Sequence, residues 1–233
     1  MITSAIIVAG GTGKRMGADV PKQFLMLGGV SILERTIRPF LACGEIGEIV
    51  ITIAEEIIGQ AVDITGRMTA DRRIRVVPGG KERQDSVWNG LAALSPKSVI
   101  VAVHDGVRPF ITPMLIRDCI KAAERWGAVT VMRPLKETVK TVEKDIVIET
   151  PDRSKLWITQ TPQVFRTALI REAHERARKE GYYGTDDCIL VERLGNTVHV
   201  IEGSDMNIKI TTQADLKIAG AILELFENGE TRC

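Results

Sequence analysis

Short apolar runs alternate with segments of helical periodicity through residues 1–132. The runs predicted as strands are residues 2–9, 49–53, 73–77, 98–103 and 128–132. The helices predicted between them are residues 31–42, 55–68, 82–94 and 112–126. This alternation favours a mostly parallel sheet with right-handed crossovers and helices on its faces. Ligand sites of such sheets lie at the carboxyl ends of the strands, so the loops there are the first candidates for a site.

The rest of the chain departs from this alternation. Residues 136–150 are predicted to form two short strands around a turn at Lys144 and Asp145. This hairpin is either an antiparallel edge addition or an arm that projects to a partner, because an isolated hairpin needs something to pack on. Further on we expect a long helix at 162–180, a shorter one at 185–194, strands at 197–201 and 207–210, and a closing helix at 212–226.

The predicted fold class is therefore α/β. We expect a Rossmann-like, three-layer α/β/α arrangement with a mostly parallel twisted sheet, in a single domain over residues 1–233.

The composition indicates a globular protein that binds anions only locally. The 233 residues carry a formal net charge of +1, with 44% hydrophobic and 26% charged residues. No bulk field attracts nucleic acid or a membrane surface, no apolar run has the length of a membrane span, and the N-terminus lacks the features of a signal peptide. The four cysteines form no C-x-x-C pair, which disfavours a zinc site and a disulfide framework. We expect a cytoplasmic protein with no nucleic-acid or membrane partner.

A glycine-rich loop follows the first predicted strand. Its glycines and nearby cations are Gly10, Gly11, Gly13, Gly17, Lys14, Arg15 and Lys22. Glycines let backbone N–H groups approach phosphate oxygens, and three cations suit a ligand with several negative charges. The spacing fits neither the G-x-G-x-x-G dinucleotide fingerprint nor the Walker A pattern. The loop therefore favours a polyphosphate ligand over an ordinary glycine turn with solvated charges.

Residues 8–33, VAGGTGKRMGADVPKQFLMLGGVSIL, resemble the N-terminal signature of nucleotidyltransferases that act on phosphorylated sugars or polyols. The PKQFL variant is similar to the cytidylyl branch, above all to the 2-C-methyl-D-erythritol 4-phosphate cytidylyltransferase family of the non-mevalonate isoprenoid pathway. Further similar segments follow in order at residues 76–91, 101–111, 150–165, 184–192 and 203–216. The resemblance thus covers nearly the whole chain.

The resemblance implies roles for particular residues. It implies that Arg15, Lys22 and Lys209 stabilise the transition state. On a strand at 207–210, alternation would send the Lys209 side chain to the face opposite Ile208 and Ile210. The nucleotide contacts that it implies are Ala9, Gly10, Gly11, Gly13, Gly80, Lys81, Ser86 and Asp105.

Asp105 ends a predicted buried strand beside the glycine loop. A carboxylate in that position could hold a Mg²⁺–triphosphate, directly or through a water, and other divalent cations could replace Mg²⁺. His104 next to it suggests a hydrolase triad, but no G-x-S-x-G elbow accompanies it, so we expect His104 to be structural. The segment departs from the family pattern in having Gly106 and Val107 in place of two alanines.

The acceptor side is also implied by the resemblance. Its residues are Asp105, Arg108, Thr138, Arg153, Thr161 and Thr185. The resemblance further implies that residues 134–155 form a protruding β-hairpin arm that builds a homodimer, and that Arg153 reaches across this homodimer. From position alone, Asp186 and Asp187 are predicted to stabilise the start of the helix at 185–194, where the helix dipole favours acidic side chains.

The activity that the resemblance implies is transfer of CMP from CTP to 2-C-methyl-D-erythritol 4-phosphate. The products would be 4-diphosphocytidyl-2-C-methyl-D-erythritol and pyrophosphate, formed by in-line attack on the α-phosphorus without a covalent intermediate. The nearest alternative is a ribitol 5-phosphate cytidylyltransferase. Two others are a sugar-phosphate uridylyl- or guanylyltransferase and a nucleotide-binding module without catalysis.

Overall fold

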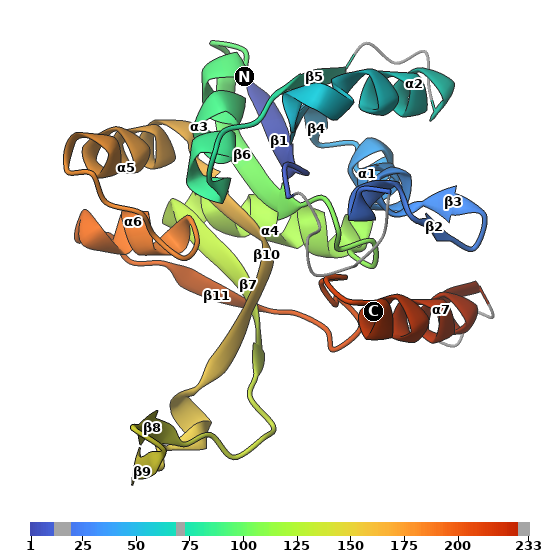
Figure 1. Cartoon of the computed structure of the whole chain (residues 1–233). Coiled ribbons are helices and arrows are strands. Elements are labelled where there is room, and N and C mark those ends of the chain that lie inside the picture. Colours follow the sequence, from blue (N-terminus) through green and yellow to red (C-terminus); the bar gives the residue numbers. More distant parts are fainter. Residues whose placement is uncertain (12–19, 69–72, 228–233) are drawn as a thin grey trace.

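The central sheet of the computed structural model contains seven strands within the described residues, 1–11, 20–68 and 73–227 (Figure 1). Their order across the sheet is β11-β7-β10-β6-β1-β4-β5. In chain order they are β1 (Ile2–Val8), β4 (Ile46–Ile53), β5 (Ile74–Pro78), β6 (Ser98–Asp105), β7 (Ala128–Pro134), β10 (Trp157–Arg166) and β11 (His199–Glu202). Each strand predicted in residues 1–132 is confirmed, and β4, β6 and β7 are longer than expected.

Strand β10 is the antiparallel member of this sheet. It pairs antiparallel with both β6 and β7, whereas the β1–β4, β1–β6, β4–β5 and β7–β11 pairs are parallel. The prediction of one helix over 162–180 was therefore wrong in its first part, because the helix α5 (Thr167–Lys179) begins only after β10. Val164 and Phe165 are fully buried in the strand, so their spacing from Leu169 and Ile170 imitated a helical face.

Helices cover both faces of the sheet, which confirms the three-layer prediction. One face packs against α1 (Ile32–Ala42), α2 (Ile58–Met68) and α4 (Pro113–Trp126). The other packs against α3 (Arg83–Ala93), α5 and α6 (Cys188–Arg193). The inner strands carry apolar side chains on both faces, as strands of a covered parallel sheet do.

The helix ends follow local chemistry. Ser31 accepts a hydrogen bond from the Glu34 N–H at the start of α1, and Thr112 accepts one from the Leu115 N–H at the start of α4. Pro113 occupies the first turn of α4, where its missing N–H costs nothing. Gly127 ends α4 with φ 90°, a conformation that favours glycine.

The C-terminal part adds a third packed cluster. Helix α7 (Gln213–Glu227) buries Ala219, Ile222 and Leu223 against residues that include Val107 and Phe110. The strand predicted at 207–210 is wrong, because these residues form an irregular segment that pairs with no neighbouring strand. The helix expected from residue 185 begins at Cys188.

A hairpin of β8 (Thr141–Glu143) and β9 (Ile146–Glu149) projects from the end of β7 and β10, away from the body (Figure 1). Its turn lies at Lys144 and Asp145, as predicted, and both have positive φ, as a two-residue hairpin turn requires. Every residue of the two short strands is exposed.

Three cysteines among the described residues, Cys43, Cys119 and Cys188, are buried and free. No helix in this part of the chain has the length and apolarity to cross a membrane.

Candidate active site

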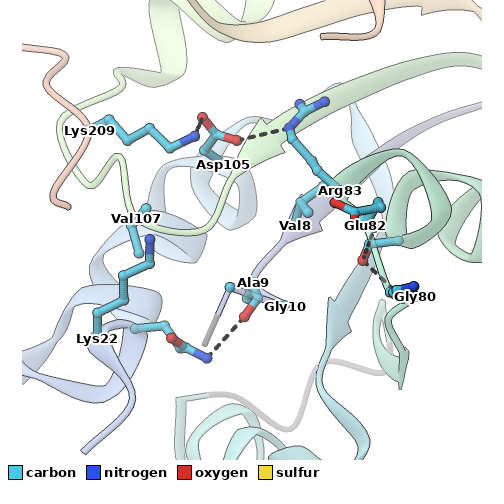
Figure 2. Close-up of a pocket in the computed structure, with 14 residues that line it drawn as sticks. Val8, Ala9, Gly10, Lys22, Gly80, Glu82, Arg83, Asp105, Val107 and Lys209 are labelled. Carbon is cyan, nitrogen blue, oxygen red and sulfur yellow. Dashed lines mark hydrogen bonds and ion pairs between the residues drawn. The ribbon is translucent and has the colours of Figure 1, made fainter. Parts of the chain in front are cut away.

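A cavity of about 300 Å³ lies at the carboxyl edge of the sheet (Figure 2). Its walls come from the ends of β1 and β6, from the turn between β5 and α3, from the short 3₁₀ helix η2 (Lys22–Phe24), and from the segment before α7. The described lining residues include four cationic side chains, Lys22, Lys81, Arg83 and Lys209, against the two carboxylates of Glu82 and Asp105. This excess of positive charge suits an anionic ligand.

Most of the predicted nucleotide and catalytic residues meet in this cavity. Those that line it are Ala9, Gly10, Gly11, Lys22, Gly80, Lys81, Ser86, Asp105 and Lys209. Gly13 and Arg15 lie outside the described residues. Residues more than 180 positions apart in the chain therefore share one cavity, as expected for the carboxyl edge of an α/β sheet.

The first glycine turn is fixed by backbone and side-chain hydrogen bonds. The Gly106 N–H donates to the Val8 carbonyl at 2.8 Å, which ties the end of β1 to the loop after β6. Gln23, which is buried, donates from Nε2 to the Ala9 carbonyl at 2.9 Å. This bond links the β1 turn to η2 and therefore holds Lys22 beside the turn.

The second glycine turn brings backbone close to the start of α3. A Cβ on Gly80 would overlap Asp85, so only glycine fits there. The Ser86 hydroxyl accepts from the Gly80 N–H at 3.0 Å and donates to the Glu82 carbonyl at 3.2 Å. Ser86 therefore shapes the turn through these bonds while also lining the cavity.

Asp105 lies at the centre of a cluster of cations. Its Oδ2 is 2.9 Å from Lys209 Nζ and 3.3 Å from Arg108 Nε, and its Oδ1 is 3.3 Å from Arg83 Nε. Burial alone would raise the pKa of this carboxyl, but the charges of Arg83, Lys209 and Arg108 outweigh burial and hold the pKa far below its usual range. Asp105 is therefore ionised at any working pH.

The segment that carries Lys209 is held by its backbone. Arg108 Nη1 donates to the Asn207 carbonyl at 2.8 Å, and the Ile210 N–H donates to the Val107 carbonyl at 3.0 Å. Ile210 is fully buried in the α7 cluster, whereas the Lys209 side chain turns to Asp105 (Figure 2). The side chains of Lys209 and Ile210 therefore point to different sides, as predicted, although residues 207–210 form no strand.

Thr161 and His104 form a hydrogen-bonded chain that holds the backbone of Asp105. The Asp105 N–H donates to Thr161 Oγ1 at 3.1 Å, and that hydroxyl lies 3.0 Å from His104 Nδ1. His104 Nε2 lies 3.1 Å from the Arg108 carbonyl, so Nε2 carries the hydrogen and Nδ1 accepts from Thr161. Burial lowers the pKa of His104 to about 4. His104 is thus a buried structural residue, as expected.

The remaining acceptor-side residues are dispersed in this chain. Arg108 is half-buried beside Asp105, and Thr185 is exposed two residues before Asp187. Thr138 and Arg153 are exposed in the segment around the hairpin, where Arg153 Nη1 donates to the Lys136 carbonyl at 2.7 Å. A single chain therefore does not bring Thr138 and Arg153 to the cavity, and their role stays a prediction.

Sequence reasoning missed Arg83 and misjudged Asp187. Arg83 lines the cavity and binds both Asp105 and Asp187, the latter through Nη1 and Oδ2 at 2.7 Å. Burial would lower the pKa of Arg83, but the two carboxylates raise it above its usual value. Asp187 is fully buried and is the N-cap residue of α6, as its predicted position implies, but its side chain makes no capping hydrogen bond, whereas Asp186 Oδ1 accepts from the Ile189 N–H. The sequence feature that could have identified Arg83 is its position in the GGKERQDSV segment, next to the second glycine turn.

The described residues offer little for a metal ion by themselves. No group of three or more His, Cys, Asp or Glu among them could hold one. Asp105 is the carboxylate at the strand end in the cavity, and Mg²⁺ in nucleotide sites commonly takes one or two carboxylates, waters and substrate phosphate oxygens. The donor set therefore fits a metal carried mainly by a triphosphate.

The fold and the cavity together define a Rossmann-like α/β protein with a cationic, glycine-walled anion site at the carboxyl edge of its sheet. Comparisons with known proteins make the class more specific. The family model for IspD, 2-C-methyl-D-erythritol 4-phosphate cytidylyltransferase, matches residues 3–225. The chain belongs to this family of nucleotidyltransferases.

Individual relatives cover nearly the whole chain. The 2-C-methyl-D-erythritol 4-phosphate cytidylyltransferase of Geotalea uraniireducens is 44% identical over 227 residues, which are 96% of this chain and 97% of that protein. The protein of the same name from Clostridioides difficile is also 44% identical over 227 residues, 97% and 96% of the two chains. The crystal structure of 4-diphosphocytidyl-2C-methyl-D-erythritol synthase from Anaerococcus prevotii has a TM-score of 0.86 at 37% identity, with 96% of each chain covered.

Proposed function

We propose that this chain transfers CMP from CTP to 2-C-methyl-D-erythritol 4-phosphate. An oxygen of the acceptor phosphate attacks the α-phosphorus in line and forms a new P–O bond. The bond from the α-phosphorus to the bridging oxygen breaks, and pyrophosphate leaves with that electron pair. The products are 4-diphosphocytidyl-2-C-methyl-D-erythritol and pyrophosphate, with no covalent enzyme intermediate.

The observation that carries this proposal is the set of fixed cations in the cavity of a chain from this family. Lys22 and Lys209 come from segments far apart in sequence and line the same cavity as the two glycine turns. In phosphoryl transfer the protein chiefly positions the groups and stabilises spreading negative charge. The two lysines, together with Arg15, perform this task in our proposal.

The glycine turns take the nucleotide side. Backbone N–H groups of Gly10 and Gly11 face the phosphates, and Gly80, Lys81 and Ser86 border the base. Asp105 would hold Mg²⁺ through a water, because Lys209, Arg83 and Arg108 already engage both of its oxygens. When bound, the metal ion would withdraw charge from the triphosphate and so improve pyrophosphate as a leaving group.

We infer that the functional form is a homodimer. Thr138 and Arg153 lie in the segment around the exposed hairpin, so in our proposal they serve the acceptor phosphate of a second copy. Exposed apolar side chains on the hairpin, Val142, Ile146, Val147 and Ile148, support this inference because such a hairpin needs a surface to pack on.

The free buried cysteines agree with a cytoplasmic location.

The deciding experiment measures pyrophosphate release with purified protein, Mg²⁺ and CTP. Release should require 2-C-methyl-D-erythritol 4-phosphate and be at least about tenfold slower with ribitol 5-phosphate, because a site built for one polyol loses transition-state contacts with another. Assays with UTP or GTP in place of CTP test the alternatives of a uridylyl- or guanylyltransferase. Binding of CTP without release with either acceptor would favour a non-catalytic module and reject the proposal.

A further inference from the structure

A chain of ionic and hydrogen-bonded groups leads from Asp105 away from the cavity, through the half-buried Arg83. Arg83 Nε lies 3.3 Å from Asp105 Oδ1, and Arg83 Nη1 lies 2.7 Å from Asp187 Oδ2. The other oxygen of Asp187, Oδ1, lies 3.1 Å from Nε2 of His174. The chain thus runs Asp105–Arg83–Asp187–His174, from the cavity into the layer of α5 and α6.

The far half of this chain is sealed from solvent. The side chains of His174 and Asp187 are 0% and 1% exposed. Because a carboxylate only accepts hydrogen bonds, His174 Nε2 carries the hydrogen, and the Asp187 N–H itself donates to Gln163 Oε1 at 3.1 Å. A buried ion pair contributes little net stability compared with apolar packing of the same volume. A contribution to folding stability therefore does not by itself explain why Asp187 and His174 are placed here.

The arrangement divides the atoms of Arg83 and Asp105 between partners. Arg83 uses Nε for one carboxylate and Nη1 for the other, so the planar guanidinium is fixed at two points. Asp105 receives Arg83 on Oδ1, and its Oδ2 receives Lys209 and Arg108. Arg83, bound to the other oxygen, therefore helps to orient the carboxylate that holds the Lys209 ammonium (Figure 2).

We propose that Asp187 and His174 are positioning residues for cytidylyl transfer, which act by fixing Arg83 and, through Asp105, the ammonium of Lys209. The inference rests on the proposed function. Without the Asp187 charge, Arg83 would turn its full charge to Asp105 and compete there with Lys209. A displacement near 1 Å at a reacting centre can cost about 10²-fold in rate.

The first test replaces Asp187 by Asn, which keeps the shape and removes the charge. We expect kcat of D187N to fall by about tenfold or more, with the KM for CTP within about threefold of the wild type, as for a loss felt mainly in the transition state. The matched control is E48Q, since Glu48 is also buried and ion-paired, with Arg75, but lies at the opposite edge of the sheet beside Ser4 and Ser98. Equal kcat in D187N and E48Q, at equal folded fraction, would overturn the proposal.

The second test asks whether Asp187 acts through Arg83. The double variant R83Q/D187N should have the kcat of R83Q alone, because Asp187 has nothing left to position. If Asp187 had only a structural role, kcat of the double variant would fall by the product of the factors measured for R83Q and D187N, and that result would count against the proposal. H174Q retains an amide donor near the place of Nε2 and should keep most of the activity, whereas H174F should resemble D187N.

A third measurement separates this inference from the proposed function. Hydrogen exchange of the Arg83 Nε–H, followed by NMR on ¹⁵N-arginine protein, should be slow in the wild type and at least about tenfold faster in D187N. If wild-type protein releases no pyrophosphate, the proposed function fails and this exchange rate still decides whether Asp187 fixes Arg83. Equal exchange in both proteins would reject the arrangement.

Discussion

His104 is enclosed by groups that satisfy both nitrogens of its neutral form. Its Nδ1 accepts from the Thr161 hydroxyl, and its Nε2 donates to the Arg108 carbonyl. A second proton would require the Thr161 hydroxyl to reverse its hydrogen bond and would put a charge at a site that is fully buried. This local chemistry explains why burial brings the pKa down to about 4.

Stability should therefore fall in mild acid. The unfolded chain binds a proton at His104 near the ordinary pKa of about 6.5, whereas the folded chain does not until about pH 4. Stability from this residue is full above pH 6.5 and is lost as the pH falls to 4, with about 2 kcal/mol lost between pH 7 and pH 5. Urea unfolding of wild type and H104Q at both values measures it. H104Q should be less stable at pH 7 but lose about 2 kcal/mol less on acidification, and parallel losses would contradict the assignment.

Lys209 and Lys22 should matter for turnover more than for binding. Removal of one pre-organised charge donor commonly costs about 10²–10³ in rate. We expect K209A and K22A each to lower kcat by about that factor while the KM for CTP changes far less. Steady-state pyrophosphate release measures both quantities, with K217A as the control because Lys217 is exposed on α7. Near-normal turnover in K209A and K22A would remove both lysines from the chemical step.

At the scale of elements, α3 packs against the centre of the sheet through a glycine. A Cβ on Gly90 would lie 2.7 Å from Cγ2 of Ile6, a fully buried residue of β1. Since β1 and α3 carry the two glycine turns of the cavity, this close contact also sets the distance between the turns. We expect G90A to lower the free energy of unfolding by about 1–3 kcal/mol, as overpacking of a core does.

The control for G90A is a glycine in an open helix position. Gly66 lies in α2 with nothing within 4 Å of an added Cβ, so G66A should raise stability by about 0.5–1 kcal/mol through helix propensity. Denaturant unfolding of both variants tests the pair. A G90A protein as stable as the wild type would mean that α3 moves away from β1 without cost.

The sequence predicted elements well where local signals decide them. The strands and helices of residues 1–132 follow periodicity and capping residues such as Ser31 and Thr112, and all were confirmed. Strand β10 was missed because an inner strand, buried on both faces, lacks polar–apolar alternation. Its buried polar residues, Gln160, Thr161 and Gln163, gave no strand signal either.

The candidate site was predictable only in the parts that carry local motifs. The glycine turns, Lys22, Asp105 and Lys209 were found from segments that resemble one family, and those residues line one cavity. The link from Arg83 to Asp187 spans 104 positions, and no local pattern marks a buried ion pair of that kind. Tertiary structure alone reveals that Asp187 faces Arg83 and His174 rather than a helix end.

At the scale of the whole molecule, the hairpin leaves apolar surface without a cover. Val142 and Val147 are cross-strand partners, 55% and 56% exposed, while Ile146 and Ile148 lie on the other face, 65% and 57% exposed. A two-stranded hairpin is marginally stable alone in water. A second copy that covers one of these faces would stabilise the hairpin and bring Thr138 and Arg153 to an acceptor site.

Charged substitutions should identify the covered face. We expect the wild type to be a dimer in analytical ultracentrifugation and one of two double variants, V142D/V147D or I146D/I148D, to dissociate, because a buried unpaired carboxylate costs several kcal/mol at an interface. The dissociated variant should also lose at least about tenfold in kcat/KM for the acceptor, since Thr138 and Arg153 would no longer reach a partner. V62D is the control, because Val62 is 49% exposed on α2, distant from the hairpin (Figure 1). A monomeric wild type, or two double variants that stay dimeric and active, would refute a hairpin-built dimer.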